Sequence, residues 1–135
     1  MDNANLQNNS NVNNNNTIYK VLAYMGILWL VGLLGKGKDD ESVKFHVGQG
    51  MILTIASVIL YIIVSLINNL LITNIFKETL FGITIGVSPT GLAIMGILNL
   101  AVTAFQLTFM IIGIVNVNKG TNKKLPIIGS FAFYK

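Results

Sequence analysis

One stretch of the chain restricts its fold more than any other, because no Asp, Glu, Lys or Arg occurs from Phe45 to Phe76. Its centre, residues 51–67, reads MILTIASVILYIIVSLI. About 20 mainly apolar residues are enough for a helix to cross the hydrocarbon core of a bilayer. Only 10% of the chain is charged and 53% is hydrophobic, whereas roughly a quarter of a soluble domain is charged. The chain is therefore predicted to lie in a membrane.

Two further apolar segments meet the same length requirement. Residues 18–35 are free of charge except for Lys20. The charge-free run from Thr79 to Asn118 contains Ser88 and Pro89, a pair typical of a helix start, and Gly120 follows where a helix would stop. The predicted fold class is thus an all-α integral membrane protein with three transmembrane helices, at residues 18–35, 48–73 and 89–117.

The segments outside these spans are short or polar. Nine of the first 16 residues are asparagine, which gives residues 1–17 too little apolar surface to fold, so a disordered Asn-rich tail is predicted there. The apolar segments at residues 79–87 and 125–134 are too short to cross. We expect the first at the membrane interface or slightly re-entrant, and the second at the interface or packed on the helix bundle. The membrane domain is accordingly predicted over residues 18–129, with residues 130–135 as a C-terminal tail.

The positions of the lysines predict an orientation, because lysine and arginine gather on the cytoplasmic side of membrane proteins. Three spans would place two of the nine lysines outside, Lys20 and Lys77. The other seven would be cytoplasmic: Lys36, Lys38, Lys44, Lys119, Lys123, Lys124 and Lys135. The prediction is a multi-pass protein of the bacterial cytoplasmic membrane with its N-terminus outside and its C-terminus in the cytoplasm. These flanking lysines explain the net charge of +4 without nucleic acid as a partner.

The composition excludes most enzyme chemistry. With no cysteine and one histidine, His46, the chain cannot build a thiol nucleophile, a cysteine-rich zinc site or an HExxH centre. We therefore predict no catalytic residue, no metal site and no cofactor. Asp39, Asp40 and Glu41 offer two interpretations: with His46 they supply ligands for a cation, or they begin a helix and interact with its dipole. His46 is likewise either a proton relay or a structural hydrogen-bonding residue.

Polar residues also recur along the third predicted span. Asn99, Thr103 and Gln106 are spaced i, i+4 and i+7, so they share one face of a helix. Uncharged polar side chains at that depth should avoid lipid. They either form hydrogen bonds between helices or line a pore.

Two short motifs support a family resemblance. The first contains Phe45, His46, Gln49 and Gly50 ahead of the long apolar helix, and the second contains Leu125, Pro126 and Gly129. On these residues, the chain resembles the Tic20-like family of small bacterial membrane proteins, named after a chloroplast inner-envelope import component. The resemblance covers residues 19–129 and implies a hydrophobic subunit that helps polypeptides to cross a membrane. It implies no catalytic residues.

The sequence thus predicts a small multi-pass protein that acts as a non-enzymatic subunit or accessory of a membrane complex, linked to protein translocation. Its predicted partners are the lipid bilayer and either further copies of itself or a larger membrane complex. One alternative is an oligomeric channel lined by Asn99, Thr103 and Gln106. Another is an immunity or membrane-stress protein.

Overall fold

The computed structural model of the protein describes residues 16–131. Of the disordered tail predicted over residues 1–17, residues 1–15 lie outside the described range, and residues 16 and 17 are helical. Most of the predicted C-terminal tail also lies outside this range. The described residues form two compact units, Ser57–Leu107 and the residues on either side of that segment.

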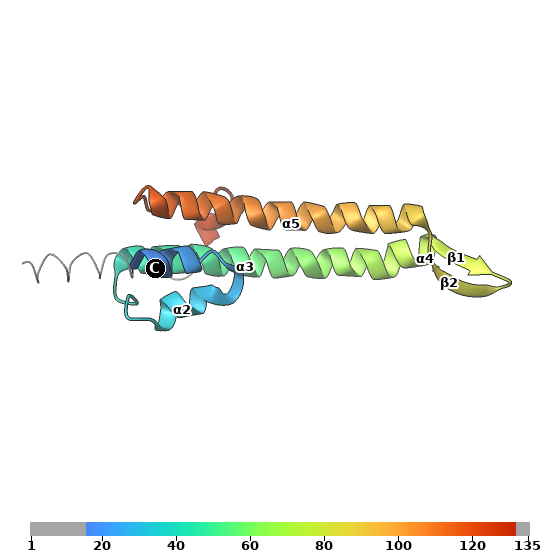
Figure 1. The fold of residues 1–135 in the computed structure, drawn as a ribbon, viewed down its shortest axis with the longest axis horizontal. Coiled ribbons are helices and arrows are strands. Elements are labelled where there is room, and N and C mark those ends of the chain that lie inside the picture. The colour runs from blue at the N-terminus through green and yellow to red at the C-terminus, as the bar shows by residue number, and fades with distance from the viewer. Residues whose placement is uncertain (1–15, 132–135) are drawn as a thin grey trace, which may run out of the picture. The chain divides into compact units, whose positions relative to one another are not determined.

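Two long helices dominate the described fold (Figure 1). The first is α3 (Glu41–Ile67), which continues through a π-helical turn, η2 (Asn68–Ile72), into α4 (Thr73–Ile75). The second is α5 (Pro89–Asn118). Within residues 16–131, these are the two helices long and apolar enough to cross a membrane, with 35 residues over Glu41–Ile75 and 30 in α5. The chain is therefore mostly helical, with two candidate spans.

Local signals explain where α5 begins and ends. The Ser88 side chain accepts a hydrogen bond from the N–H of Gly91 at 3.2 Å, and Pro89 occupies the first helical position. At the other end Gly120 adopts a left-handed φ of 63°, and its N–H donates to the carbonyl of Val117. The start and stop signals predicted for this helix are confirmed.

The π-helical turn η2 lies where asparagine and threonine side chains compete for backbone carbonyls. Thr73 donates to the carbonyl of Asn68 at 2.7 Å, and the Asn69 amide donates to the carbonyl of Ser65 at 2.8 Å. Such side-chain bonds offer the backbone an alternative to the regular ladder and accompany local distortion of a helix.

The structure does not show the continuous helix predicted over residues 18–35. Residues 16–22 are helical, a turn follows at 23–25, and the chain continues as η1 (Gly26–Leu28) and α2 (Trp29–Leu34). Gly26 has a φ of 63°, which an α-helix cannot accommodate and which glycine adopts without steric cost. We call residues 16–34 the helical hairpin. Three transmembrane helices are therefore not shown by this structure.

The all-α prediction is also wrong at the connection between the long helices. Strands β1 (Lys77–Leu80) and β2 (Ile83–Val87) pair antiparallel, with Leu80 opposite Ile83. Phe81 and Gly82 form the turn with φ of 51° and 83°, as in the two-residue turns that match strand twist. In β2 the apolar residues Ile83, Ile85 and Val87 recur with the strand period of two, whereas β1 (KETL) has no such alternation.

The best-buried apolar residues lie where the helical hairpin packs on the first turns of α3. Ala23, Val43 and Val47 are fully buried. Tyr19, Trp29 and Leu33 of the hairpin pack against them. Apolar packing therefore holds the helical hairpin against the first turns of α3.

Candidate functional site

Gln49 links α3 to the segment that follows α5. Its side-chain oxygen accepts a hydrogen bond from the N–H of Leu125 at 2.8 Å, and its amide nitrogen donates to the carbonyl of Gly129 at 2.9 Å. All three residues are buried. The Gln49 side chain thus pairs with one backbone N–H and one backbone carbonyl of a segment that lies 76 to 80 residues further along the chain.

Tyr24 and His46 form a second buried contact, one turn of α3 before Gln49. The Tyr24 hydroxyl lies 2.8 Å from Nδ1 of His46, and the two rings meet edge to face with centroids 5.7 Å apart. The His46 side chain also hydrogen-bonds Asn122, which in turn accepts a hydrogen bond from Ser42. The imidazole is therefore held from the hairpin on one side and from the segment after α5 on the other.

Glycines allow the backbones to approach around this polar cluster. A Cβ at Gly50 would overlap the backbone carbonyl of Ala23, and one at Gly113 would overlap the Tyr24 ring. At Gly129 a Cβ would meet the side-chain oxygen of Gln49. At Gly50 the closely approaching backbone belongs to the turn of the helical hairpin rather than to a second long helix.

Both sequence motifs contribute to this cluster. Phe45 stacks edge to face on His46 with ring centroids 5.3 Å apart, and Gln49 reaches Leu125 and Gly129 of the second motif. Pro126 lies in the turn between them, where its carbonyl accepts from the N–H of Ile128. Sequence reasoning missed Tyr24 and Asn122 as members of the cluster, because nothing in the pattern of either segment marks a contact with a histidine on another helix.

Asp40 begins α3 as an N-cap. One carboxylate oxygen accepts from the N–H groups of Ser42 at 2.8 Å and Val43 at 3.0 Å, and the other accepts from the Asn16 amide at 2.9 Å. Partial burial acts to raise the pKa of Asp40, but these hydrogen bonds and the positive charge of Lys20 outweigh it and lower the pKa. Within residues 16–131, no three His, Cys, Asp or Glu side chains are grouped so as to hold a metal ion.

Asp40 should therefore make stability depend on pH. A group whose folded pKa is lowered stabilises the fold above its ordinary pKa, and this contribution is lost as pH falls through the folded value. We expect thermal stability to fall below about pH 4 for this reason. Replacing Asp40 with alanine should cost about 1 kcal/mol at neutral pH and reduce the acid dependence. Asp40→Asn, which keeps a capping oxygen, should recover most of the neutral-pH loss, and equal losses in both variants would contradict the capping role.

The polar residues predicted on the third span lie on α5. The Asn99 amide donates to the carbonyl of Met95 at 2.7 Å, and Thr103 donates to that of Asn99 at 3.0 Å. The Thr103 hydroxyl also lies 3.4 Å from that of Tyr61 on α3. Gln106 is half-buried. Asn99 and Thr103 thus bond mainly within their own helix, and Thr103 makes one contact between helices.

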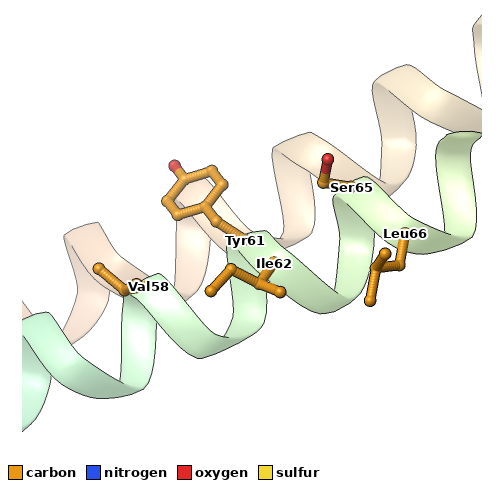
Figure 2. A pocket seen from close by; sticks show the side chains of 5 residues that line it. All are labelled: Val58, Tyr61, Ile62, Ser65 and Leu66. Atoms are coloured by element: carbon orange, nitrogen blue, oxygen red, sulfur yellow. The ribbon is translucent and has the colours of Figure 1, made fainter.

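An open recess lies along α3 near that contact (Figure 2). It is lined by Val58, Tyr61, Ile62, Ser65 and Leu66. Tyr61 and Ser65 are one helical turn apart and present their hydroxyls on the same side, while Ile62 and Leu66 form the apolar row beside them. All five side chains are exposed, so the recess belongs to the helix surface.

Comparison with known proteins corrects the family resemblance. The family model that matches covers residues 15–132 and describes the MamF/MmsF family, a magnetosome magnetite crystal formation protein family. The assignment to a Tic20-like family is therefore wrong. The motif residues are real features of the fold, but a short pattern around Gln49 does not separate two families of small helical membrane proteins. No curated protein and no solved structure matches the chain. Because the match extends over most of its length, the chain belongs to the MamF/MmsF family.

Proposed function

We propose that the protein is a non-enzymatic scaffold in the membrane of a magnetite-forming compartment. The family supplies the magnetite context. One observation supports the scaffold role. The buried polar side chains of Gln49, His46 and Tyr24 form hydrogen bonds with other parts of the same chain, as structural residues do. Their hydrogen bonds rigidify one end of the fold, while the long helices expose apolar side chains suited to lipid or to other membrane helices. The proposed link to protein translocation depended on the Tic20-like resemblance and is withdrawn with it.

In this proposal Glu41–Ile75 and α5 cross the membrane and the segment after α5 is cytoplasmic. The 35 residues of the first helix extend about 52 Å, enough to cross the hydrocarbon core and both headgroup layers. Lys119, Lys123 and Lys124 follow α5, whereas Lys77 is the lysine between the two spans. This charge difference supports a cytoplasmic position for residues 119–131. Self-association or a partner in a larger complex would use the exposed faces of the helices.

The scaffold role is tested by complementation in a magnetite-forming bacterium that lacks its own family member. The wild-type chain should restore the crystal size distribution measured by electron microscopy. A variant with Asp39→Asn, Glu41→Gln and Glu78→Gln should restore it equally, because a scaffold does not need exposed carboxylates as iron ligands. Restoration by the wild type alone would show that these carboxylates contribute directly. Purification in mild detergent with native mass measurement would then distinguish a homo-oligomer from a complex with another protein.

The channel alternative is less well supported than the scaffold. Asn99 and Thr103 already bond to backbone carbonyls of α5, and Thr103 contacts Tyr61. Replacing Asn99, Thr103 and Gln106 together by leucine should leave ion flux across proteoliposomes unchanged. A loss of flux with unchanged native mass would favour the pore.

A further inference from the structure

The outward face of the helical hairpin is apolar and exposed. Residues 21–35 contain no charged side chain, and Ile18, Ile27 and Leu34 are 54%, 67% and 78% exposed. The inward face is buried against α3, where Ala23 and Tyr24 are no more than 1% exposed. In a protein whose long helices cross a membrane, an exposed apolar face of this kind has to contact lipid or another apolar surface.

The two ends of the helical hairpin meet. The Asn16 amide donates to Asp40 at 2.9 Å, and a Cβ at Gly37 would lie 2.8 Å from the Tyr19 ring and 2.9 Å from the Asn16 side chain. A Cβ at Gly35 would likewise lie 2.7 Å from the Tyr19 ring. In a continuous helix, Tyr19 and Gly35 would instead be about 24 Å apart. The segment therefore turns back on itself and returns to the level at which it began.

The hairpin is also too short to cross. Its first helix has seven described residues and α2 has six, so each extends about 10 Å, a third of the hydrocarbon core of about 30 Å. Non-helical backbone at membrane depth is tolerated where the protein satisfies its polar groups. At the hairpin turn, the Thr54 hydroxyl of α3 donates to the carbonyl of Gly26 at 2.9 Å. The backbone N–H groups of Tyr24 and Met25 donate to the carbonyls of Val21 and Leu22.

We propose that the helical hairpin, residues 16–34, is re-entrant and inserts into the cytoplasmic leaflet alone, with the acyl chains of that leaflet covering its outward face. Lys20, Lys36 and Lys38 stand at the two ends of the segment, where they face the anionic headgroups of the cytoplasmic surface. This arrangement leaves Lys77 alone on the far side and gathers the other eight lysines on the cytoplasmic side. The three-span arrangement divides them less completely, seven to two. This inference rests on the two spans proposed above.

Thiol labelling tests the side on which the segment before the hairpin lies. The chain has no cysteine, so single substitutions Asn9→Cys, Thr79→Cys and Thr121→Cys can be compared with an impermeant maleimide in intact cells of a host that lacks the compartment, where the chain inserts into the cytoplasmic membrane. We expect modification of Thr79→Cys in intact cells, and of the other two only after permeabilisation. Modification of Asn9→Cys in intact cells, with Thr121→Cys protected, would overturn the re-entrant hairpin and restore three spans. Modification of Thr121→Cys in intact cells would instead contradict the two-span proposal itself.

Cross-linking tests the hairpin directly. A chain with Asn16→Cys and Asp40→Cys should be joined internally by a short bis-maleimide in its native membrane, because these side chains are in contact. A chain with Asn16→Cys and Thr79→Cys is the matched control and should not be joined. In a three-span protein Asn16 and Asp40 would be separated by the membrane, about 30 Å. Absence of the first cross-link in a chain whose two cysteines each react singly after permeabilisation would overturn the proposal.

Discussion

Replacing Gly50 with alanine is expected to destabilise the fold by about 3 kcal/mol, the upper end of the usual cost of overpacking a core. The added Cβ would overlap the carbonyl carbon and oxygen of Ala23, which are backbone atoms and cannot rotate away. The hairpin would therefore have to move off α3, and its contacts through Thr54 and Tyr24 would be lost. Unfolding in mixed detergent micelles, followed by the fluorescence of Trp29, measures the change, because the only tryptophan lies in the hairpin.

Gly96→Ala is the matched control for this experiment. Gly96 also lies inside a long helix, but a Cβ there meets nothing within 4 Å. We expect its stability to change by no more than about 1 kcal/mol, in the direction of the higher helix propensity of alanine. Similar results for the two variants would mean that the hairpin does not pack on α3 as described.

Replacing Gln49 with leucine is expected to release the segment after α5. Leucine has a similar size but leaves the N–H of Leu125 and the carbonyl of Gly129 buried without their present partner. Each buried group without a partner costs about 1–3 kcal/mol, so keeping the segment in place would lower the stability of the fold by about 2–6 kcal/mol. Because this cost is avoided when water hydrates both groups, we expect the segment to detach. Hydrogen exchange at the Leu125 and Gly129 amides, together with proteolysis near Lys123 and Lys124, measures this release.

Asn99→Leu serves as the control, because it removes an exposed amide that bonds within its own helix. Hydrogen exchange at Leu125 and Gly129 should be unchanged in this variant. If Gln49→Leu behaved in the same way, the Gln49 bridge would not hold the segment.

The sequence was informative where structure depends on neighbouring residues. Ser88, Pro89 and Gly120 mark the ends of α5 because caps and left-handed turns are built within a few residues. The break in the first apolar segment was not foreseen, because apolar content over residues 18–35 is the same for a crossing helix and for a hairpin. The hairpin is distinguished from a crossing helix by the contacts of Ala23 with Gly50 and of Gly26 with Thr54. Both partners lie on α3, more than 20 residues further along the chain.

The candidate site shows the same division. His46 and Gln49 were recognised as notable positions, but their partners Tyr24, Leu125 and Gly129 come from segments 22 to 80 residues distant. A pattern along one helix shows that a buried amide or imidazole needs a partner, but it does not identify that partner. The β-hairpin was missed for a local reason, because apolar and polar residues alternate only over the five residues of β2 and not over the four of β1.

The position proposed for the helical hairpin would have a consequence for the membrane itself. A segment that enters the cytoplasmic leaflet and turns back adds area to that leaflet and none to the other. Many such chains in one patch of bilayer would favour bending with the cytoplasmic face convex, as inserted helices do when they enlarge one leaflet. A vesicle inside a cell has that sense of curvature, so the turn at Gly26 would link the folding of one short segment to the form of a compartment boundary.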